Sequence, residues 1–227
     1  METGIPVVSY LRDIPPGPYP VGNTWMTLWE YAEPRPSPAL NGQEAIAMLN
    51  DLVIAMSKFQ EPLPPLGAWR YVAQAADDLS SVQDDGRIST LLLVYKQVNE
   101  KIQSEVLYPA HGDAHQGNLL ATKMGWRWID FEDVSLMPKF WDLASFIGNT
   151  ALFHGLEHSM VQAVLRKPAV SDDRLSFQLT LEARMIMATM TNWALASNGH
   201  GDWDFAQAQL ERIDDFLWLV DAGSLWR

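Results

Sequence analysis

The segment from Asn118 to Asp130 is the feature that most limits the folds open to this chain. Its halves, NLLAT and WRWID, read as two short strands, and the residues KMG between them are typical of a turn. On either side of it, the apolar residues recur mainly with the period of a helix. The sequence therefore predicts one β-hairpin inserted into a mainly helical body.

Helices are predicted for most of the chain after Asn41. This asparagine, followed by Glu44, resembles a capping box, which marks the start of a helix. The proline-rich segment EPLPPLG ends that helix. Further helices are expected at about 69–79, 88–105, 140–153, 157–166, 173–197 and 203–221.

Residues 7–31 have a different character. The stretches VVSYL and TWMTLWEYA are typical of strands, whereas RDIPPGPYPVGN between them is rich in proline and glycine and predicts a loop. The segment EPRPSP then stops regular structure. The predicted fold class is α+β, with a short N-terminal β piece ahead of the helical body and its hairpin.

Composition excludes several classes of protein. The 28 acidic and 16 basic residues give a formal charge of −12, which argues against nucleic-acid binding because phosphate contacts need clustered Lys and Arg. The absence of cysteine excludes disulfides, thiolate nucleophiles and Cys-based zinc sites. No apolar run is long enough to cross a membrane, and no leader pattern is visible, so we expect a cytoplasmic protein.

Polar groups gather at the two ends of the predicted hairpin. The stretch HGDAHQGNLL contains His111, Asp113 and Asn118, and Asp130 ends the apolar strand WID. Phosphoryl transfer uses a carboxylate near the attacking hydroxyl, together with oxygen ligands that hold Mg²⁺ against the phosphates. Because a hairpin brings its ends together, Asn118 and Asp130 are expected to face one ion, with Asp113 a loop-width away.

HGDAHQGNLL and the downstream segment WIDFEDVSLMPKFWDLA resemble the catalytic core of aminoglycoside phosphotransferases and choline kinases, which are relatives of protein kinases. The resemblance covers residues 107–144. It implies a protein-kinase-like fold in which residues 34–227 form a mainly helical C-terminal lobe. Residues 1–33 would then be the remnant of the N-terminal lobe, consisting of its last strands and the hinge.

The resemblance also implies roles for single residues. Asp113 would be the catalytic residue, Asn118 and Asp130 would bind Mg²⁺, and His111 and Asp142 would support the loop structurally. The hinge that binds the adenine through its backbone would lie at Glu30, Tyr31 and Ala32. The implied reaction is transfer of a phosphate from ATP or GTP to the hydroxyl of a small molecule, and the acidic chain permits a cationic one.

Three elements that the resemblance implies for the N-terminal lobe cannot be placed: a glycine-rich turn over the phosphates, a lysine on a following strand, and a helix with a glutamate that pairs with this lysine. There is no G-x-G-x-x-G pattern, and the first lysine, Lys58, falls inside a predicted helix. We therefore expect weak or no activity from this chain alone, whether the sequence starts late, a partner supplies the elements or the activity is lost. The alternative is an inactive binding module. A reduced lobe exposes a sheet edge and apolar surface, which predicts a homodimer.

Other patterns in the sequence have simpler interpretations. HGLEH, residues 154–158, fits an inverted zinc-protease motif, but a solvated helix end is favoured because Gly155 weakens the helix. HGDAH suggests a metallohydrolase only if distant ligands exist, so His115 is expected to be a loop residue without a chemical role. The stripe of Met185, Met187, Met190 and Trp193 predicts helix core. The acidic residues at 202–215 are either a solvated face or a site for cationic substrates.

Overall fold

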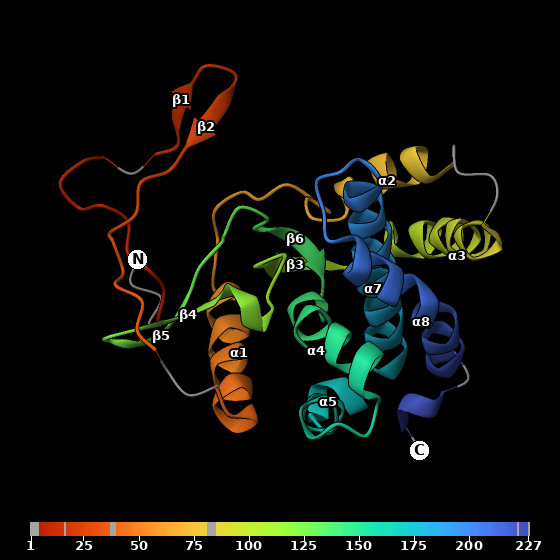
Figure 1. Ribbon diagram of the computed structural model, residues 1–227. Coiled ribbons are helices and arrows are strands. Elements are labelled where there is room, and N and C mark those ends of the chain that lie inside the picture. The colour runs from red at the N-terminus through yellow and green to blue at the C-terminus, as the bar shows by residue number, and fades with distance from the viewer. Residues whose placement is uncertain (1–4, 16, 37–39, 81–84, 222, 227) are drawn as a thin grey trace.

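The long helix α7 (Arg174–Ser197) lies at the centre of the helical body, and other helices pack around it (Figure 1). Its neighbours are α2 (Arg70–Ser80), α3 (Gly86–Ile102), α4 (Trp141–His154) and α8 (Trp203–Asp221). This arrangement comes from a computed structural model that describes residues 5–15, 17–36, 40–80, 85–221 and 223–226 of the chain. Within these ranges, the helices expected from the sequence are all present.

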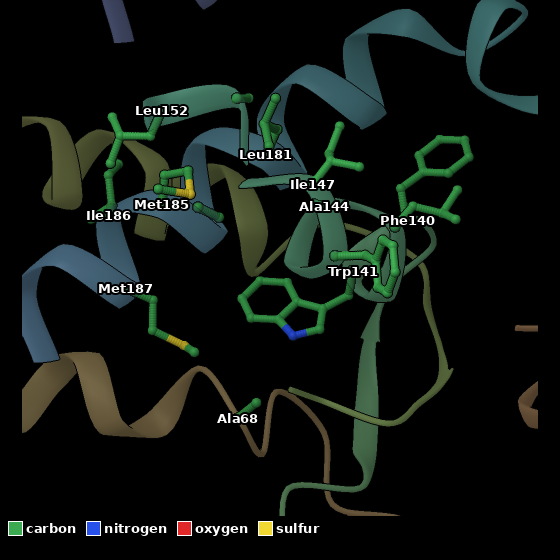
Figure 2. Close-up of a cluster of buried hydrophobic side chains, with 14 of the residues drawn as sticks. Ala68, Phe140, Trp141, Ala144, Ile147, Leu152, Leu181, Met185, Ile186 and Met187 are labelled. Atoms are coloured by element: carbon green, nitrogen blue, oxygen red, sulfur yellow. The ribbon is translucent and has the colours of Figure 1, made fainter. Parts of the chain in front are cut away.

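The core forms where α7 meets α4. Figure 2 shows Leu181, Met185 and Ile186 of α7 together with side chains of α4, including Trp141 and Ile147. These five side chains are almost fully buried. The stripe predicted as helix core is confirmed, since Met185, Met187, Met190 and Trp193 are all buried. The long apolar helix is therefore held by burial of its faces rather than by helix propensity alone.

Helix α1 (Gly42–Met56) packs against α4 and α5 (Ser159–Leu165), and the short α6 (Pro168–Ser171) follows α5. The predicted capping box is confirmed. The Asn41 side chain accepts from the Gln43 and Glu44 amides at 3.0 and 2.9 Å, and its own amide donates to the Glu44 carboxylate at 2.7 Å. These bonds satisfy N–H groups that a helix start otherwise leaves unpaired.

The predicted hairpin is confirmed as β4 (Leu119–Thr122) and β5 (Gly125–Trp128), paired antiparallel with Leu119 opposite Trp128. A second antiparallel pair joins β3 (Leu107–Ala110) to β6 (Ser135–Pro138). The sequence did not predict the strand β3. The strand LYPA is short, contains proline and pairs with a distant segment, so no local pattern marks it.

The N-terminal segment is less regular than predicted. Strand β1 (Tyr19–Val21) forms where a loop was expected. It pairs with β2 (Thr24–Met26), the first part of the strand expected at 24–32, in a small hairpin that projects away from the helices (Figure 1). The strand expected at 7–11 and the rest of the strand expected at 24–32 form only isolated bridges, including Val7 with Trp128. Pro16 of the expected loop and residues 37–38 of the EPRPSP break lie outside the described residues.

Backbone hydrogen bonds attach this segment to the central hairpin at both of its strands. Trp128 donates its backbone N–H to Pro6 at 2.8 Å, and Arg35 donates to Ala121 at 3.0 Å. The short 3₁₀ turns η1 (Gln116–Asn118) and η2 (Ser224–Trp226) complete the described elements. None of the described helices combines the length and hydrophobicity that a membrane crossing requires.

Candidate active site

The loop between β3 and β4 is fixed by the first turn of α4. The buried Asp142 carboxylate accepts from the backbone amides of His111 at 2.9 Å and Gly112 at 3.1 Å. Trp141, its neighbour on α4, donates its indole N–H to the Gly112 carbonyl at 2.7 Å. The loop backbone is therefore held at two successive residues by one carboxylate, which agrees with the supporting role expected for Asp142.

His111 joins the same loop to the hairpin. Its Nδ1 accepts from the Asp113 backbone N–H at 3.4 Å, so Nε2 carries the proton and donates to the Ile129 carbonyl at 3.1 Å. The fully buried ring also packs beside Phe131 and Trp128. These contacts use both ring nitrogens, as a structural residue does, and leave neither for a substrate.

Gly112 permits a backbone path that no other residue fits. Its φ is +92°, in the region that favours glycine. A Cβ at this position would lie 2.2 Å from the Asp133 carbonyl oxygen. The turn after Asp130 is thus in direct contact with the loop that carries Asp113.

Asp113 has partners on both carboxylate oxygens. Oδ1 accepts from Arg184 Nη2 of α7 at 2.5 Å, and Oδ2 lies 3.3 Å from His115 Nε2 and 3.5 Å from Asn118 Nδ2. Burial alone would raise the pKa of Asp113, but the His115 hydrogen bond and the Arg184 charge outweigh it and lower the pKa to about 2. The carboxylate is therefore ionised at neutral pH and accepts hydrogen bonds.

Asn118 and Asp130 occupy neighbouring positions on the hairpin. The Ile129 backbone N–H donates to the Asn118 carbonyl at 3.0 Å, so Asp130 follows directly after the residue paired with Asn118. The Asn118 amide nitrogen donates to the Asp113 carbonyl at 2.9 Å. Its side-chain oxygen has no donor among the described residues, which leaves it free to bind a cation.

The oxygen atoms of Asn118 and Asp130 suit an open Mg²⁺ site rather than a site enclosed by protein ligands on all sides. Within the described ranges, no group of three or more His, Asp or Glu side chains converges to hold a metal. Mg²⁺ commonly takes one or two protein oxygens and completes its octahedron with water and substrate phosphates. The charge of Asp130 also raises the pKa of Glu132, so negative charge is concentrated here.

A cavity of about 390 Å³ lies between the N-terminal segment and the hairpin, and it includes both Asp130 and the expected hinge. Its lining is mostly apolar, which suits the planar ring of a nucleotide base. The Glu30 N–H donates to Ser9 at 2.8 Å and is unavailable, whereas those of Tyr31 and Ala32 have no partner among the described residues. The lining residues are Val8, Trp29, Glu30, Tyr31, Ala32, Leu120, Trp128, Ile129, Asp130 and Phe131.

Sequence reasoning missed two neighbours of Asp113. His115 was expected to be a loop residue without a chemical role, but it contacts the carboxylate. Because its Nδ1 accepts from Gly117 at 3.0 Å, its Nε2 is the donor. Arg184 was not considered, since it comes from a helix distant in sequence. A signal for it exists, because a lone arginine between the buried residues Ala183 and Met185 needs a partner.

The histidines of HGLEH do not form a helical metal site. Helix α4 ends at His154, and Gly155, with φ +84°, breaks the chain direction before His158. His158 instead caps α5, where its Nδ1 accepts from Met160 at 3.3 Å. The expectation of a helix end in place of a zinc motif agrees with this geometry.

The sequence matches the model of the phosphotransferase enzyme family over residues 34–177, more than half of its length. The chain therefore belongs to the phosphotransferase enzyme family. No curated protein matches the sequence.

Solved structures with similar folds are kinases of small molecules. Choline kinase LicA from Streptococcus pneumoniae matches with a TM-score of 0.61 and 10% identity, over 78% of this chain and 64% of the LicA chain. The complex of LicA with AMP matches with a TM-score of 0.69 and 12% identity, over 96% of this chain and 75% of the LicA chain. A choline/ethanolamine kinase family protein from Mesorhizobium loti gives 0.63 and 12%, over 100% and 80%. A thermostable mutant of the aminoglycoside phosphotransferase APH(4)-Ia gives 0.65 and 16%, over 96% and 78%.

These matches establish a protein-kinase-like fold of the α+β class for this chain. The chain spans less than two thirds of the LicA chain in the first comparison. At such identities the likeness concerns the fold alone.

Replacing Gly112 by alanine should destabilise the protein by about 2 kcal/mol or more, because the methyl group collides with the Asp133 backbone and φ is unfavourable. Denaturant unfolding measures the loss. Gly86→Ala is the matched control, since a Cβ there meets nothing within 4 Å. Equal stabilities of the two variants would show that the loop does not depend on the close contact.

Proposed function

We propose that this protein transfers the γ-phosphate of ATP or GTP to the hydroxyl of a small molecule. The observation that carries the proposal is a continuous chain of contacts at the open end of the hairpin. Asp113 is bonded to Asn118, and Asn118 is paired with the residue before Asp130. Asp130 in turn borders the cavity that contains the expected hinge. The groups proposed to contact the acceptor, the metal and the nucleotide therefore follow one another in space along the open end of the hairpin.

In this proposal the base occupies the apolar cavity and hydrogen-bonds the free backbone groups of Tyr31 and Ala32. The phosphates then extend toward Asp130 and Asn118, whose oxygens hold Mg²⁺. When bound, Mg²⁺ neutralises phosphate charge and aligns the transferred group. The complex of LicA, a protein of similar fold, with AMP supports the binding of a nucleotide by this chain.

Asp113 orients the attacking hydroxyl. A carboxylate with a pKa of about 2 is a weak base, so its main contribution before transfer is to accept the hydroxyl hydrogen bond and fix the direction of attack. As the hydroxyl oxygen bonds to the γ-phosphorus, the bond from that phosphorus to the β–γ bridging oxygen breaks and ADP or GDP leaves. The hydroxyl becomes acidic in this step and passes its proton to Asp113. His111 and Asp142 act on this step only by holding the loop.

Asp113→Asn should lower phosphate transfer by about 10²–10⁴-fold while Mg²⁺–ATP still binds, because the amide keeps the shape but cannot accept the proton. Transfer from ATP to a panel of hydroxyl compounds is the measurement. Asparagine is preferred to alanine, since alanine leaves the buried Arg184 charge unpaired and weakens the fold. A fully active Asp113→Asn enzyme would refute the assignment.

Asp130→Asn should weaken Mg²⁺-dependent nucleotide binding by about ten-fold or more, a loss typical even of residues that only support a metal ligand. Calorimetric titration with ATP, with and without Mg²⁺, measures the effect. Glu132→Gln, an exposed carboxylate in the same turn, is the matched control. If both variants bind Mg²⁺–ATP as the parent does, Asp130 is not a metal ligand.

The same measurements distinguish the alternative function. A chain that binds Mg²⁺–ATP with no transfer to any hydroxyl compound is a kinase-like binding module, as expected if the missing elements must come from elsewhere. The division into a lobe remnant at 1–33 and a catalytic lobe at 34–227 is part of the proposal, as is a cytoplasmic location.

We also propose a homodimer formed through the N-terminal hairpin. Trp25 of β2 is 68% exposed, beside the exposed Val21 and Met26. Light scattering should show twice the monomer mass, and Trp25→Ser should reduce it because apolar area is lost. Trp218→Ser on α8, also 68% exposed, is the control. A monomeric parent protein would contradict the prediction.

A further inference from the structure

Arg184 places a fixed positive charge against the Asp113 carboxylate. Its Nη2 donates to Asp113 Oδ1 at 2.5 Å, and its Nε donates to Ser145 Oγ of α4 at 2.9 Å. The side chain is only 11% exposed, and Ala183 and Met185 on either side are buried in the core. The guanidinium is therefore oriented before any ligand arrives.

One amino group of this guanidinium is left over. Among the described residues, Nη1 of Arg184 has no hydrogen-bond partner, yet it is not one of the fully buried unpaired atoms, so it keeps contact with solvent. Nη1 and Nη2 share one carbon, so Nη1 is also close to the Asp113 carboxylate. Asp113 itself is 30% exposed. The free N–H donors of Arg184 thus lie in contact with solvent next to the Asp113 carboxylate, the group that the proposed reaction uses.

We infer that the acceptor carries an anionic group, a carboxylate or a phosphate ester, close to the hydroxyl that is phosphorylated, and that Arg184 selects it. The inference rests on the proposed function and narrows its substrate class. The anion would bind the free donors of Arg184, while the hydroxyl is oriented by Asp113 Oδ2, the oxygen that Arg184 leaves open. Carboxylates and phosphates match the planar donor fork of arginine.

A cationic acceptor meets the opposite situation. Its amine would lie beside a guanidinium that stays charged at any working pH and repels it. The Asp113 carboxylate is already paired with Arg184 through Oδ1, so it offers an amine less net negative charge than a free carboxylate would. Two of the acidic residues noted at 202–215 have other contacts. Asp202 caps α8, and Asp214 lines a different cavity with Lys101 and Glu182.

The test uses four probes of similar size: glycerate and glycerol phosphate as anions, glycerol as the neutral compound and aminopropanediol as the cation. Affinity is measured by calorimetry with Mg²⁺ and a non-hydrolysable ATP analogue present, and transfer is measured with ATP. We expect at least one anion to bind about ten-fold or more tightly than the cation, the worth of one charge-assisted contact. The two anions distinguish a carboxylate from a phosphate.

Arg184→Gln should remove most of the preference for the anion and leave the affinity for the Mg²⁺–nucleotide within about two-fold, whereas Arg184→Lys should keep part of it. A merely structural arginine would change the melting temperature but not the order of the probes. Preference for aminopropanediol, binding of none of the four, or an order unchanged in Arg184→Gln overturns the inference. If Arg184→Gln does not fold, the order of the four probe affinities measured with the parent protein decides whether the inference holds.

These outcomes separate the inference from the proposed function. Selective binding of the anion without phosphate transfer counts against the reaction and leaves the selectivity in place. Transfer to the neutral or cationic probe at the highest rate supports the reaction and refutes the role of Arg184.

Discussion

The rest of the site depends on the buried Asp142 carboxylate and the two loop amides that it accepts, from His111 and Gly112. Burial raises the pKa of Asp142, while the nearby His111 and these amide bonds act in the opposite direction. A carboxylate with so few other partners is stabilised only by donors in fixed positions. The bonds therefore tie the loop to the start of α4, and the direction of Asp113 follows from that attachment.

The two structural halves contribute different things to this loop. The helical body supplies rigidity and charge, since α4 provides Asp142 and Ser145 and α7 provides Arg184. The hairpin supplies the oxygen atoms of Asn118 and Asp130 and one wall of the cavity. The functional groups thus lie where loop residues are supported by packed elements, which is the usual way that a fold positions chemistry.

Much of this was predictable because the signals are local. The hairpin follows from two short strands around a turn, the start of α1 from the Asn41 cap, and the core stripe of α7 from helical spacing. Pairing of β3 with β6 was not predictable, because LYPA carries a proline and its partner is distant in sequence. Nor were the isolated bridges of the N-terminal segment, whose partners include the central hairpin.

The sequence by itself determined the family, because the match to the phosphotransferase enzyme family depends only on the residues at 34–177. It also places a carboxylate, an amide and a second carboxylate at the ends of one hairpin, the set on which the proposed Mg²⁺ and phosphate chemistry depends. Only the tertiary structure decided the surroundings of Asp113. It brought Arg184 from α7 onto one oxygen and turned His115 toward the other. Contacts between segments far apart in sequence arise from packing of the whole core. Such contacts have no fixed residue spacing, so no sequence pattern identifies them.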